Sequence, residues 1–125
     1  ADVYGKETVA SYYGDTKDDI RQSIVDNFMD SDGNLRFFIG NPKTGGYGLT
    51  LTCSHTVVYY SNDYSLEVRM QSEDRAHRIG QEDKVTYIDL IAEGTIDEKI
   101  VKALNNKIDL ASKVMGEDPK KILFD

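Results

Sequence analysis

Two arginines three residues apart, Arg75 and Arg78, are the side chains best suited to act on a charged ligand. On a helix, positions i and i+3 share one face, so both guanidinium groups can approach the same anion. Arginine is always charged, and its planar fork binds phosphate oxygens through two hydrogen bonds at once. Gln71 lies four residues before Arg75 and belongs to the same helical stripe. The spacing therefore indicates a phosphate-binding face.

Ordinary surface pairing is the alternative interpretation of the same two arginines. Acidic side chains lie nearby, and most exposed ion pairs contribute little to stability or function. These acidic neighbours are Glu73, Asp74, Glu82 and Asp83. His77 lies outside the stripe, and we expect it to have a structural or helix-end role rather than that of a general base.

A glycine-rich segment over residues 40–48 is the second candidate site. Gly40 to Gly45 fits the spacing G-x-x-x-x-G, but Gly46 and Tyr47 follow where a phosphate-binding Walker A loop requires Lys and then Ser or Thr. Glycines nevertheless allow a backbone to approach a phosphate closely and to present its N–H groups. The alternative is a tight turn after a strand that needs glycine only for its dihedral angles.

Both segments resemble motifs of a known family. The run from Gln71 to Gln81, QSEDRAHRIGQ, resembles the last motif of the second RecA-like lobe of superfamily-two helicases, in the form carried by Swi/Snf-type DNA translocases. The run from Gly45 to Thr52, GGYGLTLT, resembles the preceding motif of that lobe, and the order and separation of the two motifs agree. The similarity covers nearly the whole chain and is strongest between Leu35 and Ile100.

The resemblance implies a role in a nucleotide cleft for the arginine segment. In this family ATP with Mg²⁺ binds between two RecA-like lobes, mainly on the N-terminal lobe, which would be this chain's partner. Arg75 and Arg78 would be arginine fingers that stabilise charge on the transferred phosphoryl group. Gln71 would lie on the same face of the cleft.

The resemblance also implies a nucleic-acid contact for the glycine segment. Thr44, Gly45 and Gly46 would touch the backbone of duplex DNA, with Lys43 as an electrostatic helper. Contacts of this kind position the nucleic acid without reading its sequence.

Alternating strand and helix patterns predict an α/β fold. Strands are expected at residues 8–13, 35–39, 56–60 and 85–91, and helices at 17–29, 66–77 and 96–115. Asp15 or Thr16 is expected to cap the first helix, and Thr95 the last. This order predicts a parallel sheet with helices on both faces and ligands beyond the carboxyl ends of the strands. The resemblance adds a three-layer RecA-like lobe that lacks its first strand.

Composition limits the possible functions. A length of 125 residues predicts one domain, residues 1–125, with 116–125 as a tail that could dock or remain loose. The net charge of −7 is the wrong sign for a chain that binds nucleic acid over its whole surface, so any such contact should be local. Cys53, in an apolar segment, is expected to be buried and inert. No signal peptide or membrane span is visible, which predicts an intracellular protein that is not secreted.

The combined hypothesis is part of the C-terminal lobe of an ATP-dependent DNA translocase. Without a Walker A loop or a Walker B box, the chain should not hydrolyse ATP alone. A non-enzymatic docking module is the alternative, since a missing strand would expose a sheet edge that invites self-association or pairing with another chain. An RNA helicase lobe is disfavoured, because such helicases usually place Arg where Gln81 stands.

Overall fold

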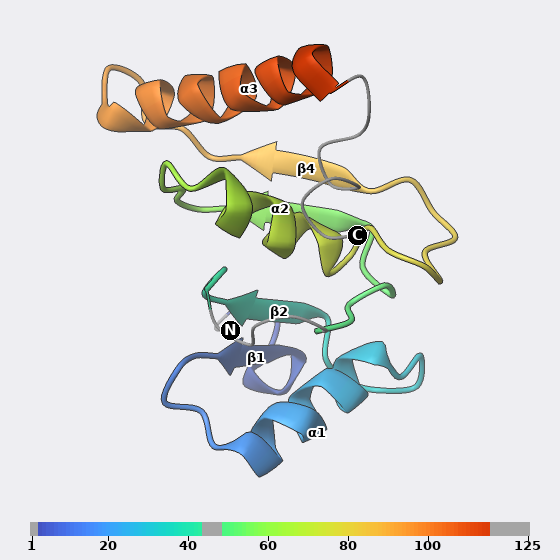
Figure 1. Cartoon of the computed structure of the whole chain (residues 1–125). Helices are drawn as coiled ribbons and strands as arrows, with labels where there is room; N and C mark the ends of the chain where they lie inside the picture. Colours follow the sequence, from blue (N-terminus) through green and yellow to red (C-terminus); the bar gives the residue numbers. More distant parts are fainter. Residues whose placement is uncertain (1–2, 44–48, 116–125) are drawn as a thin grey trace.

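The computed structural model of the chain describes residues 3–43 and 49–115 (Figure 1). Strands and helices alternate after a short 3₁₀ helix at Lys6–Thr8, which confirms the predicted α/β fold class. The elements are β1 (Val9–Tyr12), α1 (Asp18–Met29), β2 (Phe37–Gly40), β3 (Thr56–Tyr59), α2 (Leu66–Asp74), β4 (Thr86–Asp89) and α3 (Ile96–Met115). The predicted tail, residues 116–125, lies outside the described residues. So do residues 44–48 of the glycine-rich segment, which are called the glycine loop below.

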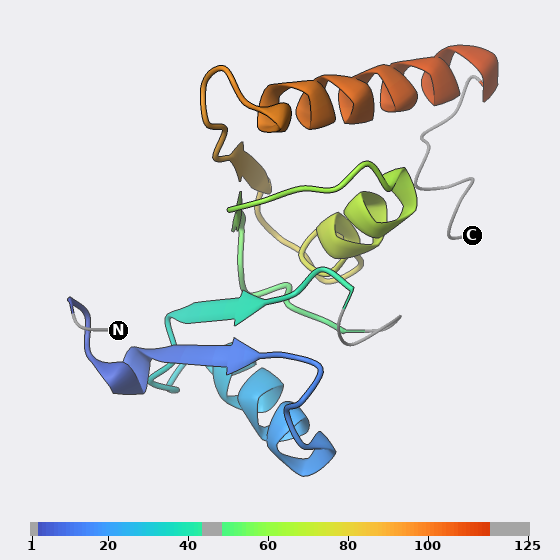
Figure 2. The same ribbon diagram turned by 90° about the vertical axis from the view of Figure 1, so that its left-hand side faces the viewer.

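The four strands form two parallel pairs. β1 pairs with β2, with Val9 opposite Phe37, and β3 pairs with β4, with Thr56 opposite Thr86. All four strands point the same way in Figure 1. Among the described residues, β2 and β3 are not hydrogen-bonded to each other. The expected sheet is therefore divided into two halves, and Figure 2 shows these halves rotated relative to one another, in keeping with the twist of parallel sheets.

Each strand pair has its own apolar packing. Phe38 of β2 lies between Tyr12 and Phe28 of α1, with both ring centroids 5.5 Å away. The other half is centred on Tyr59, Met70 and residues of α3. The buried apolar side chains of the described chain are Tyr12, Tyr59, Met70, Ala76, Ile100 and Leu104. Ile100 and Leu104 lie four residues apart, so they share one face of α3.

The helix caps were predicted with mixed success. Thr95 caps α3 as expected, since its hydroxyl oxygen accepts a hydrogen bond from the N–H of Asp97 at 3.2 Å. The predicted cap of α1 is wrong. α1 begins after Lys17, whose side chain makes no capping bond. The Thr16 hydroxyl accepts instead from the N–H of Tyr13, so it stabilises the preceding turn.

Cys53 is exposed, so the prediction that it is buried is wrong. Its thiol donates to the carbonyl oxygen of Phe28 at 3.3 Å. Partial burial raises the pKa of the thiol, which disfavours the reactive thiolate. Within the described ranges, no helix is long and apolar enough to cross a membrane.

Candidate functional site

The start of α2 is fixed at the carboxyl end of β3. The Ser65 hydroxyl accepts a hydrogen bond from the N–H of Val68 at 3.3 Å, which makes Ser65 the N-cap. The carboxylate of Asp63 accepts from the N–H of Ser65 at 2.8 Å and holds the cap in place. The helix therefore begins at the edge where the sequence predicts a ligand site.

The helix ends earlier than predicted. It stops at Asp74 instead of His77, although the N–H of His77 still bonds the carbonyl oxygen of Glu73 at 3.0 Å. Arg75 is the C-cap residue, and Arg78 lies in the following turn. The expected stripe on one continuous helix face is thus wrong for Arg78.

Side-chain hydrogen bonds explain this early end. The carbonyl oxygen of Glu73 accepts from the Tyr87 hydroxyl at 3.2 Å. The amide of Gln81 donates to the carbonyl oxygens of Ala76 at 3.0 Å and of Ser54 at 2.8 Å. The bonds to Glu73 and Ala76 stabilise carbonyl groups at and just after the end of the helix, and the bond to Ser54 ties the turn to the segment before β3. Gly80, with a φ of +100°, allows the reversal that brings Gln81 back.

The turn after α2 that carries Arg75 and Arg78, called the arginine turn below, contacts the backbone on both sides of the glycine loop. Nη2 of Arg75 donates to the carbonyl oxygen of Pro42 at 2.7 Å, before the loop. Nη1 of Arg78 donates to the carbonyl oxygen of Leu49 at 3.4 Å, after the loop. The backbone carbonyl of Arg75 also accepts from the N–H of Leu51 at 2.7 Å. The structure therefore brings together the two motifs that the sequence singled out.

The charges around Arg78 disfavour the surface-pairing alternative for that residue. Arg78 forms no ion pair with an acidic side chain in the described part of the chain. The carboxylate of Glu73, one of the candidate partners, pairs with Arg69 at 3.0 Å. Burial lowers the pKa of Arg75, but a guanidinium remains protonated in proteins. Both arginines thus keep a full positive charge beside the loop.

The other predicted site residues are placed differently. The Gln71 amide points along the helix to the carboxylate of Glu67, at 3.4 Å, and not toward the two arginines. Lys43 is exposed and pairs with Asp63 at 3.1 Å, which links the segments that follow β2 and β3. Thr44, Gly45 and Gly46 lie outside the described residues.

A pocket of about 220 Å³ lies at the carboxyl ends of β2 and β3. Its walls come from residues 41–43 after β2, from the segment after β3, and from α2. Pro42, whose carbonyl accepts from Arg75, is one of the lining residues. The pocket therefore adjoins the arginine turn at the edge of the strands.

A polar network around Arg69 holds α2 against the strands, and the sequence analysis missed it. The guanidinium of Arg69 contacts Glu73 at 3.0 Å, Asp89 at 2.6 Å and Asn62 at 2.7 Å. It also lies over the ring of Tyr59, 3.7 Å from the centroid. The spacing of Arg69 and Glu73, four residues apart on a helix, was the available signal. The network fixes the position of α2 and hence of the arginine turn.

Burial and hydrogen bonding compete in this network. Burial favours the neutral form of Asp89, but hydrogen bonds from Arg69 and Asn62 and the charge of Arg69 outweigh it, so the pKa of Asp89 is lowered. Burial raises the pKa of Tyr59 to about 12, although its hydrogen bond with Ser72 at 2.7 Å opposes the shift. Asp89 is therefore held as a carboxylate and Tyr59 as a neutral phenol.

Comparison with known proteins identifies the family. The model for the helicase conserved C-terminal domain matches residues 2–80. The chain belongs to this helicase C-terminal domain family. The ATP-dependent helicase fft2 of Schizosaccharomyces pombe is 38% identical over 111 residues, which are 87% of this chain and 9% of that protein. The human chromatin-remodeling ATPase INO80 is 34% identical over 114 residues, or 91% of this chain and 7% of its own length.

A solved structure supports the same assignment. The helicase C-terminal domain described above superposes on the C-terminal part of the Fun30 ATPase domain with a TM-score of 0.70 and 32% identity. The match covers 78% of this chain and 31% of the other. The domain is thus a C-terminal RecA-like lobe of the Swi/Snf type, and it spans about a tenth of the length of the curated relatives.

Proposed function

We propose that this lobe is one half of an ATP-dependent DNA translocase, in which Arg75 and Arg78 act on the nucleotide and the glycine loop acts on DNA. The observation that carries the proposal is the pair of hydrogen bonds from Arg75 to Pro42 and from Arg78 to Leu49, one on each side of the loop. These bonds join the expected nucleotide site to the expected DNA site.

The two guanidinium groups fit the terminal phosphates of a nucleotide. Each has five N–H donors in a planar fork, which suits tetrahedral phosphate oxygens. ATP with Mg²⁺, held mainly by the N-terminal lobe of the parent protein, would supply the phosphoryl group that is transferred. This chain's part would be to place positive charge beside that group without accepting a proton.

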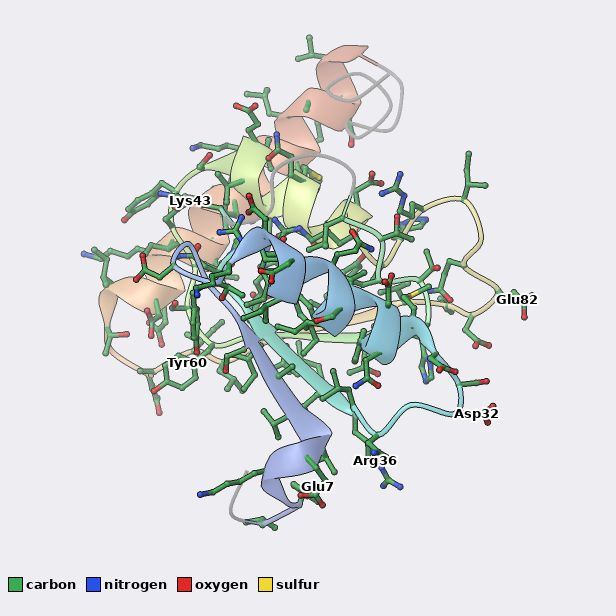
Figure 3. The ribbon with its side chains drawn as sticks, turned by 90° about the horizontal axis from the view of Figure 1, so that it is seen from below. Glu7, Asp32, Arg36, Lys43, Tyr60 and Glu82 are labelled. Carbon is green, nitrogen blue, oxygen red and sulfur yellow. The ribbon has the colours of Figure 1, made fainter. Side chains whose placement is uncertain are left out.

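The segment around Lys43 supports a local DNA contact. Lys43 is exposed and precedes the glycines at the carboxyl end of β2, and Figure 3 shows it at the opposite end of that strand from Arg36. With a net charge of −7, the chain would bind DNA through this segment and the backbone N–H groups of Thr44, Gly45 and Gly46. DNA as the substrate places the protein inside the cell.

The hydrogen bonds also provide a route for coupling. A guanidinium that rotates toward a phosphate would also move the N–H that bonds Pro42 or Leu49, because all of its N–H groups are fixed in one plane. Nucleotide binding would then change the restraint on the two ends of the DNA-contacting loop. By thermodynamic linkage, DNA binding at the loop would in turn change the affinity for the nucleotide by the same factor.

The experiment that tests this function is ATP hydrolysis by the two-lobe parent protein with duplex DNA, with duplex RNA and without nucleic acid. Stimulation by duplex DNA alone is expected. Stimulation by RNA alone would favour the RNA helicase alternative. No hydrolysis under any condition, with binding to another protein retained, would favour a docking module.

The docking-module alternative has one specific observation in its favour. Among the described residues, β2 and β3 each present an edge that no other strand pairs with. Self-association through such an edge would appear as a concentration-dependent increase in mass in sedimentation experiments.

A further inference from the structure

The side-chain amide of Gln81 is bonded to the backbone through both of its polar atoms. Nε2 donates to the carbonyl oxygen of Ala76 at 3.0 Å and to that of Ser54 at 2.8 Å. Oε1 accepts from the N–H of Asp83 at 3.1 Å. A glutamine amide carries two N–H donors, and both are engaged here. Gln81 is therefore placed to control the shape of the backbone and not to bind a ligand itself.

The carbonyl groups that Gln81 holds lie within the arginine turn. Ala76 follows Arg75 directly, and its side chain is only 2% exposed. The backbone N–H of Gln81 also donates to the carbonyl oxygen of Arg78 at 3.0 Å. Because α2 ends at Asp74, a regular helix does not fix the spacing of the two arginines. Gln81 bonds the backbone at one arginine and directly beside the other, so it can set that spacing.

The bond to Ser54 closes a ring of hydrogen bonds between the arginine turn and the segment after the glycine loop. The N–H of Leu51 donates to the carbonyl oxygen of Arg75 at 2.7 Å, and the N–H of Ser54 donates to that of Leu51 at 3.0 Å. The carbonyl oxygen of Ser54 accepts from Gln81, which also bonds Ala76 beside Arg75. Removing the Gln81 amide would break two bonds of this ring.

We propose that Gln81 is a positioning residue of the nucleotide site, whose amide sets the direction in which Arg75 and Arg78 present their guanidinium groups. The inference rests on the proposed function of the two arginines and adds a residue to it. Displacing a catalytic group by about 1 Å can cost on the order of 10² in rate. A side chain that touches only the backbone can therefore govern turnover.

Amide-resolved hydrogen exchange of the two-lobe parent tests the ring without nucleotide. Gln81→Met keeps the length of the side chain and removes its amide. The amides of Leu51 and Ser54 should exchange about tenfold faster or more in this variant, because the ring that holds them is open. Gln22→Met, at an exposed glutamine of α1, is the matched control and should leave both amides unchanged. Unchanged exchange of both amides in Gln81→Met would overturn the proposal.

ATP turnover of the same parent with duplex DNA tests the effect on the arginines. In Gln81→Met, kcat should fall by about 10-fold to 100-fold, with KM for ATP within about threefold of the natural value. A side chain that only stabilised the fold would leave kcat per folded molecule unchanged. That result, with turnover lost in Arg75→Lys, would overturn the inference and leave the proposed function standing. Natural turnover in both Arg75→Lys and Arg78→Lys would overturn both.

Restoring the donors separates hydrogen bonding from other effects of the substitution. Gln81→Lys supplies N–H donors for the carbonyl groups of Ser54 and Ala76. It should recover the protection of the Leu51 amide and bring kcat to within about threefold of the natural value. Recovery of kcat without that protection would show that the added charge acts alone, and would overturn the proposal.

A double variant shows whether Gln81 acts through the arginines. Arg78→Lys combined with Gln81→Met should turn over within about threefold of Arg78→Lys alone, because residues that act as a unit give non-additive losses. Losses that multiply would show that Gln81 acts independently of Arg78, and would overturn the proposal.

Discussion

Arg75 donates a hydrogen bond to the carbonyl oxygen of Pro42 at 2.7 Å, although 33 residues separate the two in the chain. This contact joins the turn after α2 to the segment after β2. Together with the bond from Arg78 to Leu49, it makes the arginine turn a clamp on both flanks of the glycine loop. Under the proposed function, this arrangement would let charge at the nucleotide site and geometry at the DNA site depend on one another.

The clamp predicts that removing the Arg75 side chain loosens the end of the loop. In Arg75→Met, exchange of the Leu51 amide should accelerate roughly tenfold or more, because its acceptor is the Arg75 carbonyl and the turn loses its anchor on Pro42. Amide-resolved exchange of the folded chain gives the measurement. Arg36→Met, an exposed arginine before β2, is the matched control and should leave the Leu51 amide unchanged. Equal effects of both variants would contradict the clamp.

The Arg69 network predicts a large loss of stability on removing one carboxylate. Asp89→Asn should lower the free energy of unfolding by about 2 to 3 kcal/mol, since it leaves the largely buried Arg69 without its bidentate partner. Urea titration measures this change in the free energy of unfolding, provided that the m-value is the same in the variant and the natural chain. Asp32→Asn, at an exposed turn, should change stability by less than about 0.5 kcal/mol. A loss for Asp89→Asn no larger than for Asp32→Asn would show that the network adds nothing.

The lowered pKa of Asp89 predicts acid sensitivity of a defined sign. A carboxyl whose folded pKa lies below its unfolded value stabilises the fold fully above the unfolded value. That contribution is lost as the pH falls through the folded pKa. The stability difference between the natural chain and Asp89→Asn should thus be constant near neutrality and shrink below the ordinary aspartate range. A difference that grows on acidification would contradict the assignment.

The raised pKa of Tyr59 predicts that the fold loses stability at alkaline pH. Its pKa is raised to about 12 by burial, above the ordinary value of about 10. The neutral form is favoured in the folded state, so stability should be unaffected below pH about 10 and should fall between pH about 10 and 12. Tyr59→Phe removes the hydrogen bond to Ser72, so its free energy of unfolding at neutral pH should be lower by about 1 kcal/mol. The loss of stability between pH about 10 and 12 should be smaller in this variant than in the natural chain. Tyr60→Phe, on an exposed tyrosine, should change neither quantity.

Much of this fold follows from local sequence pattern. Runs of β-branched and aromatic residues predict the four strands of the described residues, helical spacing and turn signals predict their three α-helices, and Thr95 caps α3 as predicted. The division of the sheet depends on which edges meet, and short strands such as Thr56–Tyr59 carry no information about their neighbours in space. Helical spacing also predicted that Arg75 and Arg78 share one helix face. Hydrogen bonds from Tyr87 and Gln81 to backbone carbonyl oxygens instead stabilise a helix end before Arg78.

The sequence predicts the candidate site only in part, because local pattern again gives no information about contacts between distant segments. Arg75 and Arg78 stand out because an acidic chain carries two closely spaced arginines. The contacts to Pro42 and Leu49 join segments far apart in the sequence, so no local pattern predicts them. Arg69 was overlooked because its partner Asp89 lies 20 residues away, on β4.

ATP turnover by the two-lobe parent carrying Arg75→Lys or Arg78→Lys tests the central claim most directly. Lysine keeps the charge but loses the planar fork, so kcat should fall by on the order of 10³ for an arginine that contacts the transferring phosphoryl group. KM for ATP should change much less, because the interaction is strongest in the transition state. Arg36→Lys should behave like the natural protein. Turnover within about tenfold of the natural value in both site variants would contradict the account.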